Sequence, residues 1–110
     1  MAVSPHLYRV YGIELDPAVR DIRRFRERNP DGRLDRPCVD VGSTWHDPEL
    51  RFRQHKDGIK SNSFARRFGV RLRRRLMVQR QSYRTRAEAL ASEKRCAEKL
   101  RRRGYWVWQG

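Results

Sequence analysis

Cysteine is rare in this sequence, and its two cysteines lie far apart. Cys38 and Cys96 have no second Cys or His at metal-ligand spacing beside them, so a structural zinc site is not expected. Isolated cysteines are typical of a reducing interior, where they behave as small apolar residues. No apolar run reaches the length that crosses a membrane, and the first residues lack the apolar region of a signal peptide. We therefore expect a cytoplasmic protein that no membrane holds.

Lysine is also scarce, yet the chain is strongly basic. Lys and Arg total 27 against 13 acidic residues, a net charge of +14, and only four of the 27 are Lys. A genome rich in arginine codons would explain the ratio of Arg to Lys, but not the net charge. Arginine suits forked contact with phosphate. The charge predicts a nucleic-acid partner, and DNA is favoured over RNA because the chain carries no RNA-binding signature.

The length of 110 residues allows one domain with one core. Residues 7–15 and 37–42 have the branched and aromatic content of strands, and Leu72, Leu76 and Val78 indicate a third strand within residues 71–81. A helical insertion at about residues 16–36 separates the first two strands. The pattern predicts an α+β domain with a small, mainly antiparallel three-stranded sheet flanked by helices.

Three further helices and a terminal segment complete the predicted fold. The helices cover residues 47–58, 62–68 and 85–103, and Thr85 opens the last of them with Glu88 at the capping-box spacing. Residues 105–109 alternate aromatic side chains and are predicted to form a terminal strand or an extended tail. The buried stripe of the last helix is predicted to consist of Ala87, Leu90, Ala91, Ala97 and Leu100.

The stretch VGSTWHDPELRFRQH, residues 41–55, is the most informative in the chain. Asp47 and Pro48 are typical of the first turn of a helix. Arg51 and His55 then stand four residues apart and share a face of that helix. Arg51 is a permanent cation suited to phosphate, and histidine titrates near neutral pH. The pair indicates chemistry on the backbone of a nucleic acid.

Four short motifs, in their order and spacing, resemble those of the GIY-YIG nuclease superfamily. HLY places Tyr8 on the tyrosine of the first motif, and VDVG ends in the glycine of the second, with Asp40 where the family has a tyrosine. RFRQH places Arg51 on the catalytic arginine and His55 on the accompanying histidine. EALASE places Glu93 on the glutamate that holds a single divalent metal. The resemblance covers nearly the whole chain and is closest to small stand-alone bacterial members.

The resemblance implies a metal-dependent endonuclease, which hydrolyses phosphodiester bonds in DNA in one step. Glu93 would hold Mg²⁺, with Mn²⁺ as an alternative ion, and Arg51 would neutralise the charge that develops on the phosphate. Tyr8 would position the attacking water or accept its proton, and His55 is the alternative base. Asp40 leaves three alternatives: a harmless replacement, a second carboxylate near the metal, or a lesion that removes a water-positioning hydroxyl.

Several basic side chains follow the proposed catalytic helix in the sequence. Those predicted to contact backbone phosphates are Lys56, Lys60, Arg66 and Arg67. Trp106 and Trp108 either stack on bases or fill the core. Two alternative functions stay open: a catalytically impaired protein that binds DNA or RNA without cleavage, and a ribonucleoprotein component whose arginines bind RNA.

Overall fold

A four-stranded sheet forms the middle of the fold in the computed structural model, which describes residues 7–59, 63–73 and 82–109. The strands are β1 (Arg9–Leu15), β2 (Cys38–Thr44), β3 (Gly69–Leu72) and β4 (Trp106–Gln109), in the order β3-β1-β2-β4. β1 pairs antiparallel with both β2 and β3, whereas β4 pairs parallel with β2. The chain is thus a single α+β domain with a mixed sheet.

The predicted α+β class is confirmed, but the sheet has four strands instead of the predicted three, and one of its three strand pairings is parallel. The predicted terminal strand is β4, and it makes a fourth, parallel neighbour for β2. A parallel pair needs a long crossover, which the chain provides through the helix α4 (Arg86–Arg102) between the two strands. The predicted third strand is represented by β3, which begins at Gly69 and ends at Leu72. Residues 74–81, which include Leu76 and Val78, lie outside the described part of the chain.

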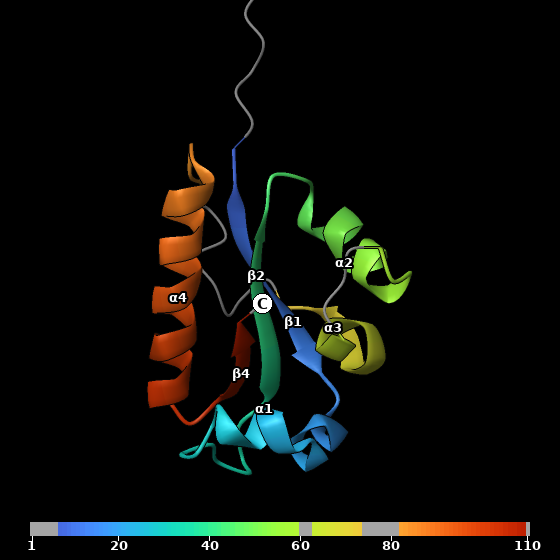
Figure 1. The fold of residues 1–110 in the computed structure, drawn as a ribbon, viewed down its shortest axis with the longest axis vertical. Helices are drawn as coiled ribbons and strands as arrows, with labels where there is room; N and C mark the ends of the chain where they lie inside the picture. Colours follow the sequence, from blue (N-terminus) through green and yellow to red (C-terminus); the bar gives the residue numbers. More distant parts are fainter. Residues whose placement is uncertain (1–6, 60–62, 74–81, 110) are drawn as a thin grey trace, which may run out of the picture.

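Helices cover both faces of the sheet (Figure 1). Among the described helices, α4 is the one that packs on the first face, against β2 and β4. The other face carries the 3-10 helix η1 (Pro17–Asp21) and the helices α1 (Arg23–Glu27), α2 (Pro48–Lys56) and α3 (Ser63–Phe68). Residues 16–36 therefore contain two short helices, because the extended backbone of Ile22 (φ −82°, ψ 120°) separates η1 from α1.

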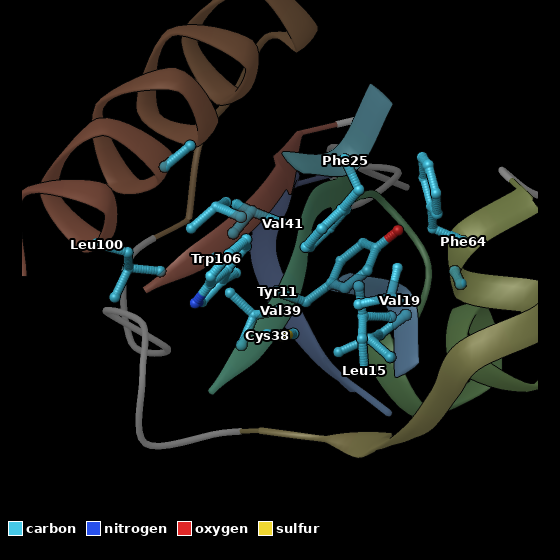
Figure 2. Close-up of a cluster of buried hydrophobic side chains, with 14 of the residues drawn as sticks. Tyr11, Leu15, Val19, Phe25, Cys38, Val39, Val41, Phe64, Leu100 and Trp106 are labelled. Carbon is cyan, nitrogen blue, oxygen red and sulfur yellow. The ribbon is translucent and has the colours of Figure 1, made fainter. Parts of the chain in front are cut away.

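The core has two layers because side chains alternate along each strand. Val10, Val39, Val41 and Val107 point towards α4, and all four are buried. The opposite layer is aromatic and includes the buried side chains of Tyr11, Phe25, Phe64 and Trp106 (Figure 2). The Trp106 ring stacks on Phe25, with 6.4 Å between ring centres, and the Trp108 ring packs against Phe64 at 4.6 Å. Both tryptophans therefore fill the core.

The predicted buried stripe of α4 is wrong at three positions. Ala97 and Leu100 are buried, but Ala87, Leu90 and Ala91 are exposed. The other inward positions belong to Ala89 and Glu93. Glu93 faces the sheet, where its carboxylate accepts a hydrogen bond from Ser43 of β2, so the buried stripe includes a polar position that the hydrophobic pattern left out.

Asn29 links the α1 segment to β4 and to α4. Its side-chain amide is 4% exposed and donates to the carbonyl oxygens of Phe25 (2.9 Å) and Val107 (3.1 Å). Its Oδ1 accepts from the backbone N–H of Val107 at 2.7 Å and from Nε of Arg101 at 3.2 Å. Four hydrogen bonds to one buried side chain tie the insertion to the sheet.

We expect Asn29→Ala to lower the free energy of unfolding by about 2–4 kcal/mol, because it leaves several buried partners without hydrogen bonds. Urea denaturation measures the change. Asp31→Ala, at an exposed position two residues away, is the matched control and should change the stability by less than about 0.5 kcal/mol. Equal stability of Asn29→Ala and the wild type would contradict this role of the amide.

No helix within the described residues is long and apolar enough to cross a membrane. Cys38 and Cys96 are both free thiols.

Candidate active site

An open cavity of about 630 Å³ lies between α2 and α4, where β1 begins and β2 ends. Side chains from both helices and from both strands line it. Four of the predicted site residues are among them: Tyr8, Arg51, His55 and Glu93. The structure thus brings together side chains that are up to 85 positions apart in the sequence (8 to 93).

Arg51 and His55 reach the cavity from α2, which begins as the sequence predicts. The Asp47 side chain accepts the backbone N–H of Glu49 at 3.0 Å, and Pro48 occupies the first turn. Arg51 is partly exposed and donates from Nη1 to the carbonyl oxygen of Ile59 at 3.1 Å. His55 is 3% exposed, one helical turn further along the same face. The helix therefore presents a cation to the cavity with an imidazole behind it.

Tyr11, on β1, joins these two residues. Its hydroxyl lies 2.8 Å from Nε2 of His55, and it also hydrogen-bonds to the Arg51 side chain. The Tyr11 ring covers Gly42 of β2, where a Cβ atom would come within 2.6 Å of the hydroxyl oxygen. Burial raises the pKa of Tyr11 well above its usual value, and the charge of Asp40 adds to the rise. The phenol therefore stays protonated at neutral pH.

Burial lowers the pKa of His55 to about 4, and the nearby positive charge of Arg51 adds to this effect. The ring is therefore neutral at pH 7. A protonated phenol next to a neutral imidazole fixes the direction of their hydrogen bond, with Tyr11 donating and Nε2 of His55 accepting. Because Arg51 can only donate, the three side chains form one chain of hydrogen bonds: Arg51 donates to Tyr11, and Tyr11 donates to His55.

This arrangement predicts the titration of His55. We expect its ring to stay neutral as the pH falls from 7 to 5 and to protonate near pH 4, which NMR of the ring protons measures with His55→Gln for assignment. Arg51→Met should raise the pH of the titration midpoint, because it removes the positive charge that helps to lower the pKa of His55. Between about pH 6.5 and 4, His55 binds fewer protons in the native protein than in the unfolded chain. The stability that the buried neutral ring contributes is therefore lost as the pH falls through that window. A midpoint near 6.5 in the wild type would contradict the buried environment.

Glu93 reaches the cavity from the opposite side, on α4. The side chain is 2% exposed, and its Oε2 accepts the Ser43 hydroxyl at 2.8 Å. Burial raises the pKa of Glu93, and this rise is opposed by hydrogen bonds from Ser43 and Gln109 and by the charge of Arg86. The carboxylate is thus held in place on the cavity wall, but it is poorly solvated as an anion.

These residues fit a hydrated divalent cation better than a fully protein-bound one. The described residues include no group of three Asp, Glu, His or Cys side chains that could enclose a metal. Mg²⁺ bound through one carboxylate keeps several waters, so Glu93 beside an open cavity suffices. A cation there would also compensate the buried charge of Glu93.

Two predicted site residues, Tyr8 and Asp40, lie outside the hydrogen-bonded group that Tyr11 forms with Arg51 and His55. Tyr8 lines the cavity just before β1, and its backbone exchanges hydrogen bonds with Tyr83 at 2.7 and 2.8 Å. Asp40 is 1% exposed and pairs in register with Ile13 of β1. Because Asp40 and Ser43 are three positions apart on β2, they face opposite sides of the sheet. Asp40 therefore lies on the Tyr11 side, away from Glu93, and is not a second carboxylate beside it.

The residues predicted to bind phosphate do not line the cavity in the described part of the chain. Nζ of Lys56 donates to the carbonyl oxygens of Arg66 and Gly69 at 3.1 and 2.9 Å, at the end of α3. Arg66 and Arg67 are exposed on α3, and Lys60 lies outside the described residues. The cation that does line the cavity beside Glu93 is Arg86.

Tyr11, Ser43 and Arg86 are the site residues that motif spacing missed. Tyr11 is three positions after Tyr8 and pairs with Gly42 in the strand register, and its hydrogen bond to His55 shows that its ring faces α2. This register could have been inferred from the two strand patterns, because the tyrosine opposite a strand glycine has room for its ring. Arg86 and Ser43 carry no comparable signal in the sequence.

No family model matches the chain, and no curated protein or solved structure matches it either.

Proposed function

We propose that the protein is a metal-dependent endonuclease of the GIY-YIG type, which hydrolyses phosphodiester bonds in DNA in the cytoplasm. One observation carries the proposal: the hydrogen-bonded chain of Arg51, Tyr11 and His55 shares an open cavity with the buried carboxylate of Glu93. A net charge of +14 supports a polyanionic substrate.

Arg51 is the residue that binds the scissile phosphate. Its guanidinium reaches the cavity while its Nη1 is anchored on the carbonyl oxygen of Ile59. Hydrolysis adds negative charge to the non-bridging phosphate oxygens, and a fixed cation stabilises that charge without reorganising. Arg86 supplies a second cation on the α4 side of the cavity.

Tyr11 and His55 take up the proton of the attacking water. The water oxygen bonds to phosphorus, and one ester P–O bond breaks so that its oxygen leaves with the bonding electron pair and takes a proton from solvent. One proton of the attacking water passes to the Tyr11 oxygen while the phenol proton passes to Nε2 of His55. The distance of 2.8 Å between these two atoms suits such a transfer. The positive charge of Arg51 lowers the pKa of His55. A bound phosphate offsets that charge, so the imidazole is a stronger base when substrate is present. This route needs no tyrosinate, whose formation burial opposes.

Glu93 would hold the divalent cation, Mg²⁺ or Mn²⁺, with Ser43 orienting its carboxylate. Bound there, the cation would supply Lewis-acid stabilisation of the phosphate and of the leaving oxygen. The protein supplies the buried carboxylate of Glu93 and the open cavity beside it.

Asp40 acts through Tyr11 in this proposal. Its charge adds to the rise in the pKa of Tyr11 and so keeps the proton on the phenol until His55 accepts it. Asp40 stands where the second motif has a tyrosine, and Tyr11 supplies a phenol to the site instead. Tyr8, on the rim of the same cavity, is the alternative phenol.

The second candidate function is binding of DNA or RNA without cleavage, and Asp40 is the observation that favours it. A carboxylate replaces the tyrosine expected in the second motif, and it lies on the far side of the sheet from Glu93. Both candidates predict binding that weakens as salt increases. They differ in whether purified protein with Mg²⁺ nicks supercoiled plasmid DNA. Nicking supports the nuclease, whereas binding with no nicking, and nicking gained in Asp40→Tyr, supports the second candidate.

A further inference from the structure

The exposed side chains that line the cavity include several large apolar ones beside its cations. Among the described residues, seven large hydrophobic side chains are exposed, and three of them line this one cavity. These are Trp45, Ile59 and Leu90, with exposed fractions of 47%, 52% and 40%. The floor below them carries Arg51, Tyr11 and Glu93. A site that contacts only phosphates would need cations alone, so the exposed apolar side chains indicate a further, uncharged group on the substrate.

Trp45 is held on a short, fixed connection. It follows Thr44, the last residue of β2, and precedes Asp47, which caps α2. The backbone N–H of His46 donates to Oγ1 of Thr44 at 3.0 Å. The Trp45 and His46 rings lie 3.8 Å apart between centres, at an angle of 30°. The indole is therefore supported by a second ring while nearly half of its surface is open.

The other rim residues come from different elements and complete the same edge. Ile59 follows α2, and its carbonyl oxygen accepts from Arg51 at 3.1 Å, which places it next to the proposed phosphate-binding cation. Leu90 extends from α4 one turn before Glu93. An apolar edge within reach of both Arg51 and Glu93 is suited to a flat, uncharged group attached to the phosphate that they bind.

We propose that Trp45 stacks on an unpaired base next to the scissile phosphate, so that the substrate is DNA with unpaired nucleotides, which negative supercoiling favours in a plasmid, rather than a relaxed and fully paired duplex. This inference rests on the proposed function, because it assumes that the cavity binds a phosphodiester. In a duplex the bases stack on each other and the outer surface offers phosphates and sugars. Only an unstacked base exposes the face that an indole can cover, and aromatic stacking of this kind tolerates any base sequence.

The test is binding in EDTA, where no cleavage is required. A fluorescein-labelled dT12 oligonucleotide and a 12-base-pair duplex are titrated with wild type, Trp45→Ala, Trp45→Phe and Leu34→Ala, and anisotropy gives the dissociation constants. We expect Trp45→Ala to bind dT12 about tenfold more weakly and the duplex unchanged, with Trp45→Phe near the wild type. Leu34 is the control because it is the most exposed of the large apolar side chains that the structure describes, at 79%, and lies outside the cavity lining.

Two results would overturn this inference. One is an equal loss of dT12 and duplex binding in Trp45→Ala, which would indicate a general effect on the fold or the charge. The other is no loss of either, which would leave the indole without contact to the substrate. Neither result depends on hydrolysis: a protein that does not cut DNA can still show the selective loss, and an active nuclease can fail to show it.

Discussion

Tyr11→Phe should reduce the cleavage rate by about 10²–10⁴-fold, the range expected when a proton-transferring group is removed. The substitution deletes the oxygen that lies 2.8 Å from Nε2 of His55 and keeps the ring that packs over Gly42. The loss should appear in kcat, because Arg51 still binds the phosphate. Unfolding should become easier by about 1–3 kcal/mol, because buried His55 loses its donor. Single-turnover cleavage and urea denaturation measure the two effects.

Tyr8→Phe is the matched control, because Tyr8 lines the same cavity and carries the same hydroxyl. We expect it to keep cleavage within about tenfold of the wild type, since the Tyr11 relay is intact. The reverse result, with Tyr8→Phe inactive and Tyr11→Phe active, would assign the reaction to the first-motif tyrosine predicted from the sequence. It would also leave the buried hydrogen bond of Tyr11 with a structural role alone.

Glu93→Gln should abolish both divalent-metal binding and cleavage. Substitutions in the shell around a metal ligand already cost 10–100-fold. Among the described residues Glu93 is the one carboxylate that lines the cavity, so its loss should reduce cleavage by more than about 100-fold. Electron paramagnetic resonance of Mn²⁺ measures binding directly, because bound Mn²⁺ loses the sharp signal of the free ion. This readout is independent of hydrolysis.

The fold of Glu93→Gln should be at least as stable as that of the wild type at neutral pH. Burial raises the pKa of Glu93 in the native state, so the native protein binds the proton more tightly than the unfolded chain. The ionised carboxylate therefore costs stability as the pH rises through its unfolded pKa, and an uncharged amide avoids this cost. Glu98→Gln, at an exposed position on the same helix, should leave Mn²⁺ binding and cleavage unchanged. Full Mn²⁺ binding by Glu93→Gln would place the metal elsewhere.

The local elements of the fold could be predicted because their signals are short-range. Asp47 and Pro48 mark the start of α2, and Thr85 marks the start of α4, whose capping bond from the backbone N–H of Glu88 is 3.1 Å long. The parallel pairing of β4 with β2 could not be predicted in this way. It depends on the packing of α4 across the sheet, which no local pattern encodes.

The candidate site was predicted where the residues share one element and missed where they depend on strand register. Arg51 and His55 follow from helical spacing alone. Tyr11 reaches them only because its position opposite Gly42 turns its ring towards α2. Leu90 was predicted to be buried because it is apolar, but Glu93 takes the inward position on α4, and Leu90 instead lines the rim of the cavity.

The predicted phosphate contacts show that closeness in sequence is a limited guide to closeness in space. Lys56 directly follows His55 on α2, yet its ammonium group donates to carbonyl oxygens at the end of α3. Arg86 is 35 positions beyond Arg51 (51 to 86) but lines the same cavity. In a chain with this many arginines, the topology selects which of them line the cavity.

The most direct test of the proposed nuclease is the conversion of supercoiled plasmid to nicked or linear DNA by purified protein, with Mg²⁺, with Mn²⁺ and with EDTA. Glu93→Gln, prepared in the same way, excludes a contaminating nuclease. We expect nicking by the wild type with either metal, none in EDTA, and none by Glu93→Gln with metal. Equal nicking by wild type and Glu93→Gln, or no nicking by wild type that binds the plasmid, would contradict the proposal that this cavity hydrolyses phosphodiester bonds.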